Sequence, residues 1–320
     1  MNTANLSTLE RLLHDYAGPS AARALLSRIF APPALLEHHG ESVPRAVLAQ
    51  AMNMILFGDL LTRVPAAALR VGEVVREGSL VRFDHGALRT VASAAARRLP
   101  SGYRAFARIL GPLGFQLSGT YPLPRIHMTG RSFTHEDHPE DIAQFFVSEI
   151  ALTGFTPQFQ RAAERIVGTS EDPLAAQATL SLARLSHDRA LPYDDARILL
   201  GYVLPCFGRH HCLPALADYN ALLAESAEMA WIATEGNTFN HVTERVRDIG
   251  AVAESQKALG RPMKAAIEVS TNGRVRQTAY FAATVERQFI ADDGALVTQR
   301  VPGSFYEFIE RDAITDAPGR

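Results

Sequence analysis

The stretch "EGNTFNHVTERV", residues 235–246, places His241 directly after Asn240, where a β-strand pattern meets a polar run that suits the start of a helix. Its threonine, phenylalanine and valine residues favour an extended chain. A second stretch, "VRFDHGALRT" at residues 81–90, places His85 at the end of another short apolar strand. Two histidines in matching local settings, far apart in the sequence, indicate that one structural unit is used twice.

The pattern around each histidine predicts that unit. From residue 80, a strand with His85 is followed by predicted helices over 86–99 and 102–114, and then by strands. After His241, an amphipathic helix is predicted over 244–260, and strands follow again. Each copy reads as a βαβββ module. Because a single module would expose a sheet edge and an apolar face, we expect the two to pair into one barrel-like sheet.

Turn residues support the strands of the second copy. Asn272-Gly273 and Asp293-Gly294 are strong signals for β-hairpins, and a last strand is expected over 304–312. Residues 7–65 and 155–232 have helical spacing, and Ser7 with Glu10 has the spacing of a capping box.

The expected fold class is α+β, with paired βαβββ modules that form one barrel-like sheet, a helical N-terminal region and a helical insertion. All parts are expected to pack as one compact unit. The expected divisions are a helical region at 1–79, a first module at 80–151, a helical insertion at 152–233 and a second module at 234–320.

Composition narrows the class of protein. Of 320 residues, 47% are hydrophobic and 21% are charged, with a net charge of −2, so we expect a globular protein without a basic surface for nucleic acid. Two cysteines are too few for a disulfide framework. No signal peptide is visible, and the most apolar stretch, residues 51–61, is interrupted by Asp59 and too short to span a bilayer. The expectation is a soluble cytoplasmic protein with neither a membrane nor a nucleic-acid partner.

Two paired histidines become a metal site when a carboxylate joins them. If the modules pair about a pseudo-twofold axis, His85 and His241 lie close together, and two imidazoles with one carboxylate form the face that is typical of non-haem iron(II) sites. In the last predicted strand, Glu307 shares a face with Phe305 and Ile309. A carboxylate on such an apolar face is costly unless it is paired, and metal coordination would offset that cost. Glu310 falls on the opposite face and is expected to be solvated.

These stretches resemble the vicinal oxygen chelate superfamily and, within it, the 2-oxoadipate dioxygenase/decarboxylase family. The resemblance implies that the paired modules form a metal-binding barrel of the vicinal-oxygen-chelate type. The motifs that carry the resemblance are "DHGALRT", "NTFNHVTERV" and "GSFYEFIER", with their order and wide spacing over residues 80–311. By position, the resemblance implies His85, His241 and Glu307 as the metal ligands and catalytic centre, and Arg89 as a substrate-binding residue.

The resemblance also implies an activity. Family members use Fe(II) and O₂ to convert 2-oxoadipate to 2-hydroxyglutarate and CO₂ in lysine breakdown, so the implied partners are a 2-oxo acid and O₂. Longer members draw substrate contacts from a segment beyond the final ligand, whereas this sequence ends at Arg320. The metal site therefore follows from the resemblance more directly than the substrate does.

Other interpretations stay open at this point. The same scaffold serves metal-dependent isomerases, lyases and ring-cleaving dioxygenases, and a non-catalytic protein could use it to bind a small molecule. Arg89 could instead cap a helix or pair with Asp84. The stretch "CFGRHHC" at 206–212 is too tightly spaced for a typical zinc site.

Roles are also open for four polar residues outside the predicted ligand set. His127 and His135 lie near the acidic residues 136–141, which favours a solvated loop over a functional site. Gln277 and Gln288 are expected on barrel strands, facing either the substrate or the outside.

Overall fold

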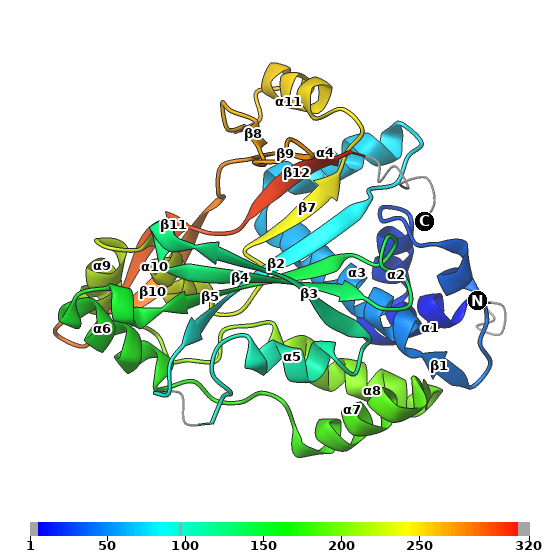
Figure 1. Ribbon diagram of the computed structural model, residues 1–320, viewed down its shortest axis with the longest axis horizontal. Coiled ribbons are helices and arrows are strands. Elements are labelled where there is room, and N and C mark those ends of the chain that lie inside the picture. The colour runs from blue at the N-terminus through cyan, green and yellow to red at the C-terminus, as the bar shows by residue number, and fades with distance from the viewer. Residues whose placement is uncertain (1–5, 96–97, 313–320) are drawn as a thin grey trace.

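An eight-stranded curled sheet forms the centre of the molecule (Figure 1), whose computed structural model describes residues 6–95 and 98–312. The strands run in the order β3-β4-β5-β2-β7-β12-β9-β8. Their bounds are β2 (Phe83–Ala92), β3 (Phe115–Leu123), β4 (Met128–His135), β5 (Gln144–Ala151), β7 (His241–Arg245), β8 (Glu268–Val269), β9 (Val275–Ala279) and β12 (Phe305–Arg311).

The sheet consists of two matching halves. β2 pairs parallel with β5 in the first half, and β7 pairs parallel with β12 in the second. β2 and β7 then pair with each other in the antiparallel sense and join the halves. Helix α5 (Arg104–Leu110) follows the first strand of one half, and α11 (Ile249–Ala258) follows that of the other. The predicted α+β class and the pairing of two modules are confirmed, although the strands within a module are not all antiparallel.

Both histidines lie near the beginning of a strand, not at its end as predicted. β2 continues through the first half of the stretch 86–99, so the predicted helix there is wrong for the residues that β2 contains; residues 96–97 lie outside the described chain. Strand β2 lies between β5 and β7 in the sheet, and this tertiary context overrides the local preference of alanine for helix. The helix predicted over 244–260 begins only at Ile249, where the Asp248 side chain accepts a hydrogen bond from the Ala251 amide.

Helices and two short sheets surround the central sheet. The remaining helices are α1 (Thr8–Ala17), α2 (Pro19–Leu26), α3 (Arg45–Arg63), α4 (Pro65–Arg76), α6 (Pro157–Val167), α7 (Ala176–Asp188), α8 (Tyr193–Val203), α9 (Leu216–Leu223) and α10 (Ala227–Glu235). The short sheets pair β1 (Ser42–Pro44) with β6 (Ala190–Pro192) and β10 (Thr284–Ile290) with β11 (Leu296–Pro302). As predicted, the Ser7 side chain caps α1 by accepting a hydrogen bond from the Glu10 amide.

Two apolar clusters hold these layers together. The larger joins α1–α4, α7 and α8 to one face of the central sheet, where Phe57, Tyr306 and Phe308 are fully buried. The smaller joins α6, α9 and α10 to the β10–β11 hairpin, at the left of Figure 1. None of the described helices combines the length and apolar character that crossing a bilayer requires.

Candidate metal centre

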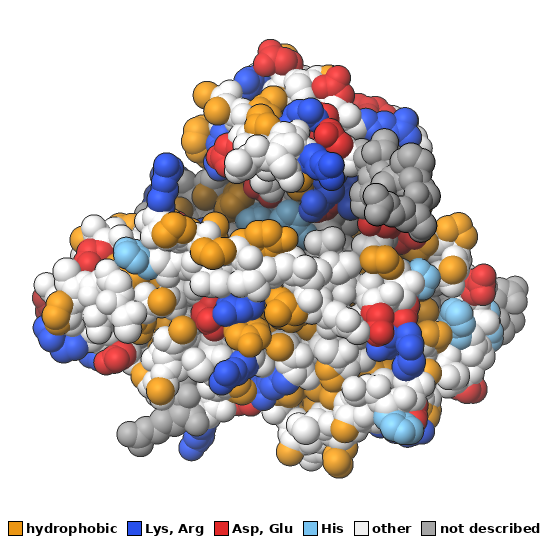
Figure 2. Space-filling view, viewed as in Figure 1, with side chains coloured by type: hydrophobic (Ala, Val, Ile, Leu, Met, Phe, Trp, Pro, Cys, Tyr) orange, Lys and Arg blue, Asp and Glu red, His pale blue; other side chains and the backbone are white. Residues whose placement is uncertain are grey.

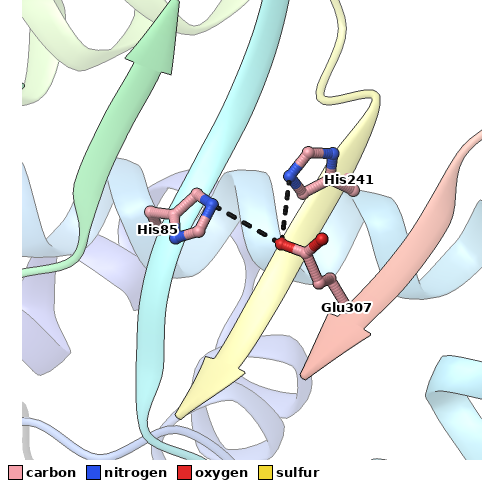
Figure 3. Close-up of side chains that lie close together, drawn as sticks. All are labelled: His85, His241 and Glu307. Atoms are coloured by element: carbon pink, nitrogen blue, oxygen red, sulfur yellow. Dashed lines mark ion pairs between the residues drawn. The ribbon is translucent and has the colours of Figure 1, made fainter. Parts of the chain in front are cut away.

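Three side chains converge on the face of the sheet opposite the larger apolar cluster (Figure 3). His85 Nε2 lies 3.8 Å from Glu307 Oε2, and His241 Nε2 lies 3.6 Å from the same oxygen. One ligand atom from each residue lies within 4.8 Å of the others, the only such group of three found among the described residues. In Figure 2 a recess separates the part of the molecule that carries α11 from the body, and histidine side chains are visible within it.

The strand register explains why these residues meet. β2, β7 and β12 are adjacent in the sheet, and each supplies one of the three residues. His85 lies opposite Thr243 on β7, and Thr243 lies opposite Glu307 on β12. His241 lies two residues before Thr243, so all these side chains point to the same face.

A buried carboxylate orients His85. Asp84 is 3% exposed, and its Oδ1 accepts a hydrogen bond from His85 Nδ1 at 2.9 Å. Arg245 and Arg311 also donate to this carboxylate. Burial alone would raise the pKa of Asp84, but the hydrogen bonds from His85 and Arg311 outweigh it and hold the pKa well below its ordinary value. Asp84 therefore stays ionised, and its pairing leaves Nε2 of His85 free to bind a metal.

His241 has a neutral neighbour instead. The Asn240 side chain lies 2.9 Å from His241 Nδ1, and Phe305 stacks on the imidazole with ring centroids 4.6 Å apart. Burial lowers the pKa of His241 well below its ordinary value, and the neighbouring His85 and Arg89 act in the same direction. The imidazole is therefore neutral at physiological pH, as metal ligation requires.

Glu307 is held by weaker polar contacts. Thr243 Oγ1 donates to Glu307 Oε2 at 2.8 Å and lies 3.1 Å from His85 Nε2, and Gln277 Nε2 lies 3.4 Å from the same oxygen. Burial raises the pKa of Glu307, while His85 and the bond from Thr243 oppose that rise. Burial therefore disfavours the charged form of this carboxylate, and a bound cation would reverse that preference.

This donor set fits a divalent transition metal. Two imidazole nitrogens and one carboxylate oxygen on a single face are the ligand types that non-haem iron(II) sites use, with further positions left open. Donors at about 2.1 Å from a shared ion lie about 3 Å apart when adjacent. The distances of 3.6 and 3.8 Å approach that spacing and require only a small inward shift of side chains.

Arg89 lies beside this centre in a pocket. A cavity of about 180 Å³ is bounded by Arg89, Tyr219, Trp231 and Phe305, among others. The Arg89 guanidinium lies 5.3 Å from the centre of the Trp231 ring, and within the described chain it makes no ion pair. Burial lowers the pKa of Arg89, but a guanidinium stays charged in proteins. The pocket therefore holds a cation that makes no ion pair within the described chain, with Glu228 in the same pocket as its nearby negative charge, next to Phe305, which stacks on His241.

These contacts decide one alternative left open for Arg89 and correct the prediction for Glu310. Asp84 pairs with Arg245 and Arg311, and not with Arg89. Glu310 is not solvated but half-buried: it accepts a hydrogen bond from the Ile249 amide at the start of α11 and pairs with Arg276.

The apolar face of the last strand is also reversed from the prediction. Tyr306 and Phe308 are fully buried on the face opposite Glu307, so Glu307 faces the recess and not the apolar interior.

The other predicted residues lie elsewhere. His135 is fully buried and accepts a hydrogen bond from the Asp137 amide, so its assignment to a solvated loop is wrong, whereas His127 is exposed. Gln277 faces the centre, but Gln288 lies on the separate β10–β11 hairpin and not on the central sheet. His211 contacts the Ala233 carbonyl oxygen, and the stretch 206–212 contributes to no metal-ligand group among described residues.

Sequence reasoning missed the residues that surround the ligands. Asp84, Asn240 and Thr243 each touch a predicted ligand, yet none was singled out for a role at the centre. A signal existed for the first two, since each directly precedes a predicted histidine. Thr243 could be found only from the strand register.

Comparison with known protein families gives one match over most of the chain. Residues 37–320 match the model of a family described as 2-oxoadipate dioxygenase/decarboxylase. A curated 2-oxoadipate dioxygenase/decarboxylase from Pseudomonas putida is 26% identical over 268 residues, which are 74% of this chain and 56% of that protein. The chain thus spans little more than half the length of this relative.

Solved structures show the same fold. A protein from Ralstonia eutropha JMP134, described as a member of the glyoxalase superfamily, is 51% identical, with a TM-score of 0.94 and 96% of each chain covered. The hydroxyglutarate synthase from Oryza sativa, solved in complex with 2-oxoadipate, is 20% identical with a TM-score of 0.63, and the match covers 86% of this chain and 85% of that one.

Proposed function

The chain belongs to the 2-oxoadipate dioxygenase/decarboxylase family, and we propose that it is a non-haem iron(II) enzyme that decarboxylates and hydroxylates a 2-oxo acid with O₂. The proposed reaction converts 2-oxoadipate and O₂ to 2-hydroxyglutarate and CO₂, a step of lysine breakdown. The observation that carries the proposal is the convergence of His85, His241 and Glu307 on one face of the sheet.

These three residues are proposed to hold the metal. When bound, iron(II) would supply electrons to O₂ and a Lewis acid for the 2-oxo acid. Three protein ligands leave open positions on one side, which a 2-oxo acid and O₂ require together. Asp84 holds Nδ1 of His85 so that Nε2 faces the metal position, and Thr243 holds the Glu307 carboxylate between the two histidines.

Arg89 is proposed to bind a carboxylate of the substrate. A guanidinium presents paired donors that match a carboxylate, and Arg89 already lies in a pocket next to the centre. Trp231 and Phe305 give that pocket partly apolar walls, and a charged contact is stronger beside such walls than in open water. The chain's residues thus position one end of the acid while the metal position takes the other.

Stoichiometry tests the proposed function. The purified protein would be loaded with iron(II) without oxygen and mixed with 2-oxoadipate and O₂, while oxygen uptake, CO₂ and 2-hydroxyglutarate are measured. One molecule of each per 2-oxoadipate consumed is expected. Metal binding without oxygen uptake on any 2-oxo acid would favour a different metal-dependent enzyme or a binding protein. Uptake with a shorter or longer acid only would correct the substrate.

A further inference from the structure

The two halves of the sheet repeat a short pattern around their histidines. The first half has "DHGALR" at 84–89 and the second has "NHVTER" at 240–245. A twofold axis between the two antiparallel strands would superimpose His85 on His241. The pairing shows this, because His85 lies opposite Thr243 and Ala87 lies opposite His241. The residue before each histidine and the arginine four residues after it therefore correspond in the repeated pattern, although a β-bulge between Phe83 and His85 shifts the register at Asp84.

Beside His85, the arginine of the second copy, Arg245, forms an ion pair. Arg245 Nε donates to Asp84 Oδ2 at 2.8 Å, and Asp84 also binds His85. The Asp84 side chain is fully enclosed and pairs with Arg245 and Arg311 together, so the Arg245 guanidinium is held in an ion pair.

Beside His241, the corresponding residues form no ion pair. In the repeated pattern Asn240 corresponds to Asp84, and Arg89 corresponds to Arg245. Asn240 is 4% exposed and neutral, and Arg89 makes no ion pair within the described chain, although the charge of Glu228 in the same pocket acts on it. The cation lies instead against Trp231, in the pocket beside the centre.

We propose that Asn240 is a specificity-determining residue, because its neutral amide leaves Arg89 free to bind a carboxylate that an aspartate there would displace. This inference rests on the proposed function, in which Arg89 receives the carboxylate of a 2-oxo acid. The difference between Asp84 and Asn240 thus turns one of two equivalent arginines into a structural residue and the other into a binding residue.

The amide also serves His241. Its Nδ2 lies 2.9 Å from His241 Nδ1, while its Oδ1 is buried without a hydrogen-bond partner. Ligation through Nε2, which faces Glu307, requires the proton of His241 on Nδ1. A half-turn of the amide then places Oδ1 at that proton and gives the unpartnered oxygen its bond. Asparagine can therefore orient the ligand as Asp84 does, without the charge that would bind Arg89.

Asn240→Asp tests the two roles separately. In the cobalt(II)-loaded protein without O₂, calorimetry should show that the variant binds 2-oxoadipate at least tenfold more weakly than wild type, because the new carboxylate pairs with Arg89. Its affinity for cobalt(II) should equal or exceed that of wild type. Asn240→Leu, which has a similar size, should instead bind cobalt(II) more weakly because Nδ1 of His241 loses its acceptor.

A double-mutant cycle tests the ion pair without any ligand. Arg89→Met should destabilise the Asn240→Asp protein more than it destabilises wild type, as measured by urea unfolding of the metal-free proteins. Equal effects in both backgrounds would overturn the inference, as would undiminished binding of 2-oxoadipate by Asn240→Asp. If wild type binds no 2-oxo acid, the proposed function fails, while the cycle still decides whether position 240 controls Arg89.

Discussion

The first half of the sheet, β2 with β5, and the second half, β7 with β12, have one backbone plan but different side chains at equivalent positions. Both place a histidine on the central strand. In the second half the neighbouring strand supplies Glu307, which pairs with Thr243. In the first half Ala87 takes the place of Thr243, and the residue that pairs with it is Phe146. The repeated histidine brings two ligands together, and Phe146 in place of a second carboxylate leaves one side of the centre open.

Loss of Glu307, the ligand that only the second half supplies, should have the largest effect on metal binding and turnover. Glu307→Ala should abolish iron binding and oxygen uptake, since two neutral imidazoles leave the charge of the metal uncompensated. Glu307→Gln should bind weakly, because an amide oxygen is a poorer donor than a carboxylate. Metal analysis beside an oxygen-electrode assay measures both effects.

Glu310→Ala is the matched control for Glu307. It removes a carboxylate from the same strand, but Glu310 contacts Arg276 and the start of α11 and not the centre. This variant should lose some stability and keep its iron. An empty site in Glu310→Ala beside a filled one in Glu307→Ala would contradict the proposed ligand set.

Restoring the symmetry should also stop turnover. Phe146 lies with its ring centroid 6.3 Å from that of His85, so Phe146→Glu would place a second carboxylate beside the metal position. We expect at least tenfold tighter cobalt(II) binding and at least a hundredfold loss of oxygen uptake, because the added ligand occupies a position that substrate and O₂ need. Phe146→Leu controls for the loss of the ring and should leave cobalt(II) affinity near wild type.

Removal of the free cation should have a smaller effect on catalysis. Arg89→Ala should lower kcat/KM for the 2-oxo acid by about tenfold to a hundredfold, the equivalent of one charge-assisted hydrogen bond of about 1.5–3 kcal/mol. Metal content should stay near that of wild type. Arg89→Lys should recover part of the loss, because an ammonium lacks the paired donors. Unchanged kinetics in the alanine variant would remove Arg89 from the site.

The last effect is on stability and not on catalysis, and concerns a buried histidine of the first half that lies outside the centre. Burial lowers the pKa of His135 to about 4 from an ordinary 6.5, so the unfolded chain binds a proton that the folded chain rejects between these values. Stability should therefore fall as pH drops from 6.5 to 4, by on the order of 3 kcal/mol from this group. Urea unfolding of wild type and His135→Gln across this range should show a shallower decline in the variant; parallel declines would contradict the assignment.

The sequence predicted the repeated module because its signals are local. The histidine motifs, the Asn272-Gly273 turn and the alternation around Glu307 can all be read over a few residues. Local preference failed in the stretch after His85, where alanine favours helix but burial between two strands requires β2. The choice of Glu307 agrees with the geometry although the apolar side of its strand was misread.

The positions of Phe146 and Asn240 could not be understood from the sequence alone. Their meaning depends on which strands pair and in what register, and these are contacts between residues far apart in the chain. Arg89 and Arg245 likewise look alike locally, and only the buried Asp84 separates them. The four-part division at residues 79, 151 and 233 stays a prediction.

Diffraction at the iron absorption edge tests the central claim most directly. Crystals of the protein loaded with iron(II) without oxygen would locate the metal by its anomalous signal. The account predicts one strong peak, bounded by Nε2 of His85, Nε2 of His241 and a carboxylate oxygen of Glu307, with its remaining side open toward the pocket of Arg89. A peak at another group of residues, or none at this one in protein that contains iron, would contradict it.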